Sequence, residues 1–173
     1  MVPALFRQYT FANDVIRHLQ ADTRINPELR KAALQFVQTQ GDSLVQLSTE
    51  SWNIVKSPGG NAQAYRHALQ MAEVGNRLVP RFTDFMNTLG IAQYRVGAYA
   101  DALATLTRCQ ELRASPDAGD LAFMAMANFK LGRADQARDQ LDQLRALMKE
   151  PSRSGNAELQ GFLREAEALI VRR

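Results

Sequence analysis

The stretch NTLGIAQYRVGAYADALATLTR, residues 87–108, decides the fold. Gly97 lies near its middle, where a short turn between two helices needs a residue that readily adopts positive φ. We therefore predict one helix on either side of this glycine, at about 82–96 and about 98–113. The two helices would pack against each other as an antiparallel pair.

The same arrangement of side chains recurs on both sides of this stretch. Small residues such as Gly90 and Ala102 allow the helices of a pair to approach closely, whereas Leu89 and Leu106 fill the space between successive pairs. Because each pair leaves an apolar face bare, neighbouring pairs must stack to bury it. Six sets of positions, spaced by 34 and then 35 residues, are apolar or small in every copy: Trp52, Met86 and Leu121; Val55, Leu89 and Met124; Tyr65, Tyr99 and Ala134; Ala68, Ala102 and Ala137; Ala72, Leu106 and Leu141; Gly75, Cys109 and Leu144.

Proline and glycine divide the rest of the chain into further helix-length segments. Pro27 after Asn26 suits the first turn of a capped helix, and Asp42 and Asn61 can cap the next two. No alternation of apolar and polar residues between hairpin turns occurs, so we expect an all-α fold. The other expected helices lie at about 4–21, 27–39, 43–56, 62–79, 118–131, 133–149 and 156–171.

The central copy resembles the tetratricopeptide repeat (TPR). The residues that carry the resemblance are Leu89, Gly90, Tyr94, Gly97, Tyr99, Ala102 and Leu106, with Pro80 closing the preceding unit. The following copy departs from the pattern at Ala125 and Ala134, and the preceding copy has Lys56 in a small-residue column. The resemblance implies an α-solenoid of about three helix pairs, with extra N-terminal helices and a C-terminal capping helix. Its expected divisions, within one helical domain over 1–173, are N-terminal helices at 1–42, a degenerate repeat at 43–80, repeats at 81–115 and 116–150, and a cap at 151–173.

A narrower resemblance covers most of the chain. The segments 19–37, 50–60, 64–80, 87–108 and 120–138 are similar to a bacterial repeat region typical of planctomycetes. In that family the region often lies C-terminal to a serine/threonine protein kinase domain or to β-propeller repeats. The resemblance implies the tail of a larger signalling protein. It does not imply a kinase, because no Gly-rich loop, Val-Ala-Ile-Lys strand or His-Arg-Asp loop occurs.

Charge, hydropathy and cysteine content limit the kinds of partner and the compartment that we expect. The formal charge is only +3 and acidic and basic residues are interspersed, whereas nucleic-acid binding needs a clustered basic face. No stretch approaches the ~18 apolar residues of a membrane span, and the N-terminus has no long apolar core of a signal peptide. One cysteine, Cys109, is compatible with a reducing compartment. We expect no nucleic acid, no membrane contact in this segment, and a cytoplasmic protein.

No catalytic or metal-binding pattern accompanies the repeats. His18 has Asp14 and Asp22 four residues to either side, but zinc sites favour three or four ligands rich in Cys and His. The chain also has no CxxC or HExxH sequence. Cys109 falls in a helix-packing column and is interpreted as a small buried hydrophobe. We therefore expect no enzyme activity, no metal and no cofactor.

In TPR proteins the first helix of each pair lines a concave groove, and this implies where a partner would bind. Asn87 fits one position of the clamp with which some family members hold a C-terminal carboxylate. Ile91 and Met126 occupy positions where such a clamp needs polar residues, so an apolar or mixed groove for a helix or an extended peptide is favoured. The expected groove residues are Asn53, Asn87, Ile91, Tyr94, Arg95, Ala122, Met126, Phe129 and Lys130, with Arg95 near the rim. The alternative is that some of them pack against the terminal helices, with the last helix filling part of the groove.

The favoured interpretation is a non-catalytic protein–protein interaction module, the regulatory or scaffolding tail of a bacterial signalling protein such as a serine/threonine kinase. The alternative is a structural homo-oligomerisation domain, in which a second copy occupies the groove. Only this alternative predicts self-association. An enzyme is the third hypothesis, and the sequence offers no candidate residue for it.

Overall fold

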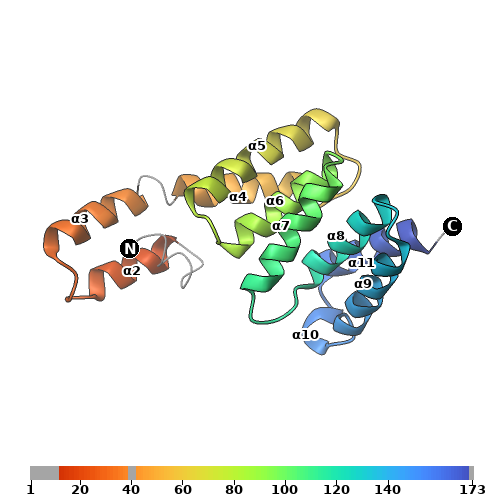
Figure 1. Cartoon of the computed structure of the whole chain (residues 1–173). Helices are drawn as coiled ribbons and strands as arrows, with labels where there is room; N and C mark the ends of the chain where they lie inside the picture. Colours follow the sequence, from red (N-terminus) through yellow and green to blue (C-terminus); the bar gives the residue numbers. More distant parts are fainter. Residues whose placement is uncertain (1–11, 39–41, 172–173) are drawn as a thin grey trace.

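The computed structural model describes residues 12–38 and 42–171, and these are helical with no strand (Figure 1). The predicted all-α fold class is confirmed. No helix in the described ranges is long and apolar enough to cross a membrane. The helices are α2 (Ala12–Ala21), α3 (Pro27–Phe36), α4 (Asp42–Val55), α5 (Ala62–Leu78), α6 (Thr83–Arg95), α7 (Tyr99–Leu112), α8 (Ala118–Lys130), α9 (Ala134–Leu147), α10 (Pro151–Ser154) and α11 (Ala157–Ile170).

Capping side chains mark the starts of α3, α5, α8 and α11, whereas α6, α7, α9 and α10 begin without one. The Asn26 and Asn61 side chains accept backbone N–H groups at the starts of α3 and α5, as predicted. Asp117 and Asn156 cap α8 and α11 in the same way. The short helix α10, with Pro151 in its first turn, was not predicted. The cap predicted at Asp42 and the first part of the helix expected at 4–21 lie outside the described residues and side chains.

Two helical turns repeat in atomic detail. Gly97 and Gly132 have φ values of 88° and 76°, a region in which only glycine is unstrained. The N–H of Gly97 donates to the Tyr94 carbonyl at 3.0 Å, and the N–H of Gly132 donates to the Phe129 carbonyl at 3.0 Å. The next residue in each turn donates across five residues at 2.9 Å, which completes a Schellman motif. The two glycines therefore close two equivalent hairpins.

The helices pack as successive hairpins. α4 packs on α5, α6 on α7, and α8 on α9, while α5 also packs on α6 and α7 on α8. The first helices of the hairpins touch one another as well, α4 with α6 and α6 with α8. α11 then lies on α8 and α9. In Figure 1 these helices form the larger part of the molecule, and α2 and α3 extend from it on one side.

The columns of the sequence repeat occupy mostly buried positions. Five of the six sets are buried, apart from the half-buried Trp52. The remaining set differs from one hairpin to the next, because Tyr65 is buried, Tyr99 is half-buried and Ala134 is exposed. Tyr65 reaches the loop after α4, where its hydroxyl donates to the Ser57 carbonyl at 2.9 Å. Ala134 at the start of α9 is too short for such a contact.

The first hairpin departs from the spacing of the other two. α8 and α9 begin and end 35 residues after α6 and α7, respectively. By contrast, α4 ends at Val55, well before the position that corresponds to the end of α6. Pro58 lacks a backbone N–H, and Gly59 has a φ of 85°, so the helix cannot continue through this loop. This loop lies between the helices expected at about 43–56 and 62–79.

The N-terminal helices have a core of their own that joins the first hairpins. α2 and α3 contribute Val15, Leu19 and Ala33, which are buried. The cluster continues through Val37 and Leu44 to Val79 and Phe85, so that it reaches α6. The main core lies in the three hairpins and α11.

Close packing between α6 and α7 depends on Gly90. A methyl group there would lie 2.5 Å from the Leu106 Cγ atom, and Leu106 is fully buried. Gly155 is the matched control, because nothing lies within 4 Å of a methyl group at that position.

We expect Gly90→Ala to lower the free energy of unfolding by about 1–2 kcal/mol, because overpacking outweighs the better helix propensity of alanine. Urea denaturation measures this change. Gly155→Ala is expected to stay within about 0.5 kcal/mol of the parent. If the two variants were equally stable, the close approach of α6 and α7 at Gly90 would be refuted.

Candidate functional site

α4, α6 and α8 form a surface that we call the inner face, and α11 lies against it. Phe162 of α11 packs edge-on against Phe123 of α8, with ring centroids 5.2 Å apart. It also meets Trp52 of α4 at 6.0 Å, again edge-on. α11 therefore reaches across to the first hairpin in addition to extending the stack.

The predicted groove residues lie on the inner face or at its ends, and most are covered. Asn87, Ile91, Tyr94, Ala122 and Met126 are buried, Phe129 is half-buried, and Asn53 and Lys130 are exposed. The expectation that Arg95 lies near the rim is wrong, since its side chain is only 5% exposed. Most of these residues are therefore packed against other parts of the chain, and α11 packs on α8. A partner-binding role for these residues stays a prediction.

Arg95 lies where α4, α6, α8 and α11 meet. Its Nε donates to the Val55 carbonyl at the end of α4 at 2.8 Å. Its two terminal nitrogens pair with both carboxylate oxygens of Glu165 on α11. The guanidinium carbon also lies 4.9 Å from the centroid of the Phe123 ring. This planar, two-pronged pairing fixes the rotation and position of α11 on the inner face.

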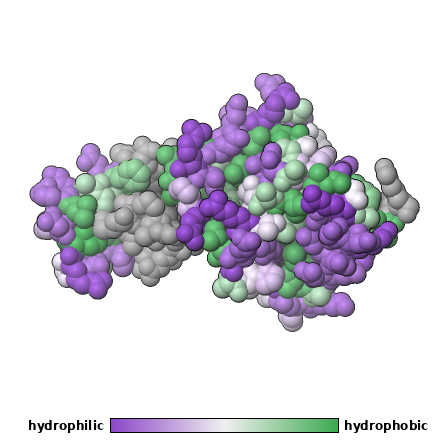
Figure 2. Space-filling view, in the orientation of Figure 1, coloured by the Kyte–Doolittle hydropathy of each residue, from purple (hydrophilic) through white to green (hydrophobic). Residues whose placement is uncertain are grey.

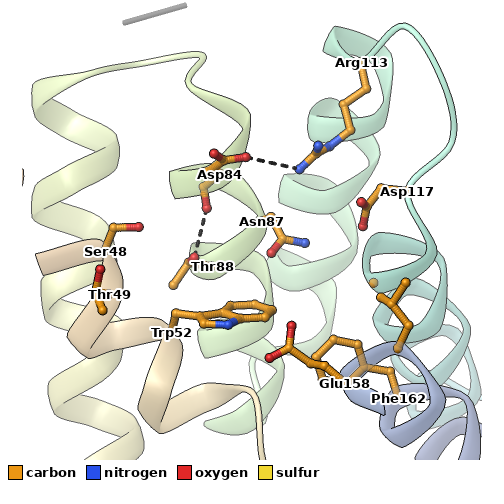
Figure 3. A pocket seen from close by; sticks show the side chains of 12 residues that line it. Ser48, Thr49, Trp52, Asp84, Asn87, Thr88, Arg113, Asp117, Glu158 and Phe162 are labelled. Carbon is orange, nitrogen blue, oxygen red and sulfur yellow. Dashed lines mark hydrogen bonds and ion pairs between the residues drawn. The ribbon is translucent and has the colours of Figure 1, made fainter. Parts of the chain in front are cut away.

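The part of the inner face that α11 leaves open is a cavity of about 360 Å³ (Figure 3). Its wall comes from α4, α6, the loop between α7 and α8 with the first turn of α8, and the start of α11. The lining residues are Ser48, Thr49, Trp52, Asp84, Asn87, Thr88, Arg113, Asp117, Gly119, Glu158, Leu159 and Phe162. Of these only Asn87 was among the predicted groove residues. Sequence spacing gave no signal for the others, because they converge from four separate segments.

A second hollow lies between the loop after α4 and α11. It measures about 690 Å³ and is lined by the loop residues Lys56, Ser57 and Pro58 and by one face of α11. Glu158 and Phe162 border both hollows. The contact between Trp52 and Phe162 thus lies beside two openings.

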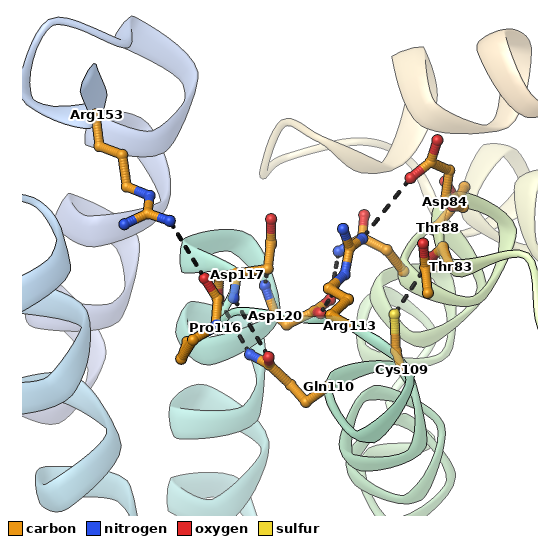
Figure 4. A network of polar contacts seen from close by, with 11 residues as sticks. Thr83, Asp84, Thr88, Cys109, Gln110, Arg113, Pro116, Asp117, Asp120 and Arg153 are labelled. Atoms are coloured by element: carbon orange, nitrogen blue, oxygen red, sulfur yellow. Dashed lines mark hydrogen bonds and ion pairs between the residues drawn. The ribbon is translucent and has the colours of Figure 1, made fainter. Parts of the chain in front are cut away.

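A buried carboxylate, Asp120, anchors a polar network beneath the first cavity (Figure 4). Asp120 is fully buried, and the Asn87 amide donates to its Oδ1 at 2.6 Å. Arg113 Nε lies 3.2 Å from its Oδ2, and the same guanidinium lies 3.8 Å from Asp84. Asp117 caps the helix by accepting the Asp120 N–H at 2.9 Å. The network ties the end of α7 to the starts of α6 and α8.

Burial raises the pKa of Asp120 to about 6. The hydrogen bond from Asn87 opposes this shift, the charge of Asp117 adds to it, and Arg113 opposes it. Burial also raises the pKa of the neighbouring Cys109 thiol to about 12. Its Sγ donates to the Thr83 carbonyl at 3.3 Å. Cys109 therefore keeps its proton at neutral pH, as expected of a buried packing residue.

No protein-family model, no curated protein and no solved structure matches this chain. The family resemblance and the function therefore depend on the residue pattern and on the geometry described above.

The raised pKa of Asp120 has a consequence for stability. Between pH 3.8, the usual pKa of an aspartate, and about pH 6, the unfolded chain has lost this proton while the folded chain keeps it. The contribution of Asp120 to stability is therefore lost as the pH rises through this window, by about 2–3 kcal/mol in total.

Asp120→Asn removes the titrating group and keeps its shape. We expect the difference in unfolding free energy, parent minus variant, to fall as the pH is raised from about 4 to about 7. Urea denaturation at several pH values measures it, with the exposed Asp139→Asn as control. A difference that stays constant over this range would contradict the raised pKa.

Proposed function

We propose that this chain is a TPR-type interaction module, an α-solenoid of three helix pairs that binds a peptide or another protein through its inner face. Three facts support the architecture. The hairpins α6–α7 and α8–α9 repeat at a spacing of 35 residues. Both contain the same glycine turn, and each hairpin stacks on the next through its first helix.

The cavity of about 360 Å³ is the observation that carries the binding proposal. It combines the aromatic side chains of Trp52 and Phe162 with hydroxyl, amide and charged groups. Apolar walls with a few convergent polar groups are typical of recognition sites. Helices and loops from distant parts of the chain hold these groups, so the site is formed before a partner arrives.

The open part of the inner face is short, and this limits the partner to an extended segment or a few side chains. Burial of two or three anchors at about 1.5–3 kcal/mol each corresponds to a micromolar, transient contact after ordering costs. Contacts of this kind suit a regulatory or scaffolding tail of a cytoplasmic bacterial signalling protein such as a serine/threonine kinase. The resemblance to repeat regions that follow kinase domains supports this assignment.

Homo-oligomerisation is the second candidate function, favoured by exposed apolar side chains away from the cavity. Leu29 and Phe36 on α3 are 53% and 45% exposed, and Leu78 on α5 is 45% exposed. Figure 2 shows an apolar area at the end of the molecule that α2 and α3 occupy. A second copy could cover these side chains.

Selection of random peptides on the purified chain, followed by calorimetric titration, tests the proposed function. Thr49→Phe places a bulky ring at the cavity wall and is expected to weaken the selected peptides at least about tenfold by steric exclusion. Thr107→Phe on the exposed side of α7 is the matched control and is expected to leave binding unchanged.

Light scattering over a range of protein concentrations separates the two candidates. The interaction module is expected to keep a constant mass, whereas the oligomerisation domain gains mass with concentration. Self-association together with failure to select any peptide would overturn the proposed function.

A further inference from the structure

The cavity on the inner face is lined by more negative than positive groups. Asp84, Asp117 and Glu158 contribute carboxylates, and Arg113 contributes the single guanidinium. The carboxylate of Asp120 lies directly beneath. Figure 3 shows Asp84 and Arg113 at one end of the cavity, and Glu158 beside Trp52 and Phe162 at the other.

Arg113 is engaged with the protein itself. It pairs with Asp120 at 3.2 Å and with Asp84 at 3.8 Å, and the side chain is 22% exposed. The Asp120 carboxylate is fully buried away from water. It therefore neutralises most of the positive charge of the Arg113 guanidinium. Arg113 therefore has little capacity left to attract an anion from solution.

The other carboxylates that line the cavity are either without an ion pair or only weakly paired. Glu158 and Asp117 form no ion pair within the described part of the chain. Asp84 is 48% exposed, and its contact with Arg113 is long. A cation that enters the cavity would gain these three interactions, whereas a carboxylate would be repelled.

The aromatic wall suits the same kind of ligand. Trp52 is half-buried beside Phe162 at one end of the cavity, and tryptophan is the aromatic side chain that attracts cations most strongly. A volume of about 360 Å³ accommodates one long side chain and its flanking backbone. The apolar stem of a lysine or arginine would pack on the rings while its charged head meets the carboxylates.

We propose that this cavity receives a lysine or arginine side chain from an extended segment of the partner protein. The inference deepens the proposed function and rests on it. The site selects a basic anchor, and this preference is opposite to that of a clamp that holds a C-terminal carboxylate. Ser48 and Thr49 of α4 also line the cavity and offer hydroxyl groups to the peptide backbone.

The chain's single tryptophan, Trp52, reports occupancy of the cavity directly. The probes are capped alanine–leucine heptapeptides with arginine, lysine, citrulline or glutamate at the centre. Citrulline has the size of arginine without its charge. The readout is the indole N–H signal of Trp52 and the backbone amide signals of Asp84 and Glu158 in ¹H–¹⁵N spectra.

We expect the arginine and lysine peptides to shift these signals and to bind about tenfold more tightly than the citrulline peptide. Raising the salt from about 50 to about 300 mM should weaken this binding. Glu158→Gln should weaken the basic peptides about three- to tenfold and the citrulline peptide by a smaller factor. Asp139→Asn on the exposed side of α9 is the matched control and should have no effect.

Equal binding of the arginine and citrulline peptides at Trp52 would overturn the inference and leave the cavity as a docking site. Tighter binding of the glutamate peptide would overturn it in the same way. Silence of the Trp52 signal with every peptide would also overturn it. The proposed function would fail with it only if the peptides selected from the random library likewise left this signal unchanged.

Discussion

The arrangement of the inner face depends on one buried guanidinium. Arg95 is almost fully enclosed, and a buried charge is tolerated only when it is paired and hydrogen-bonded. Its partners are a carbonyl of α4 and the carboxylate of Glu165 on α11, with an aromatic ring of α8 beneath it. Four helices thus meet around a single side chain, and α11 has one position that satisfies it.

The position of α11 determines which part of the inner face is open to the partner that we propose. The contact between Phe162 and Trp52 brings α11 to α4, and Ile91, Tyr94 and Met126 of the inner face are buried. The open space is displaced toward the starts of α6, α8 and α11, where carboxylates gather around Arg113. Recognition in this account is therefore local and electrostatic, in contrast to a peptide lying along a continuous apolar groove. The buried network around Asp120 keeps the walls of that space fixed.

The sequence predicted the helices α5 to α9 and α11 to within a few residues, because spacing and glycine turns are local properties. It also left a gap between the helices expected at 43–56 and 62–79, where the structure has the loop that contains Pro58. It did not indicate that Arg95 pairs with Glu165, 70 residues away, because either residue alone resembles an ordinary surface charge. The sequence likewise did not indicate that Asp120, at the start of an otherwise apolar helix, is buried in a polar network. The sequence did not predict the cavity, because the cavity forms only where four separate segments meet in the folded chain. The repeat spacing places residues on one helix at a time.

The central claim is that the pair of Arg95 and Glu165 holds α11 across the inner face. A double-mutant cycle with Arg95→Met and Glu165→Gln, measured by urea denaturation, tests it most directly. The account predicts a coupling energy of about 1.5–3 kcal/mol, since each single variant leaves a charged or polar group without its partner. A coupling energy below about 0.5 kcal/mol would show that α11 is held by other means and would contradict the account.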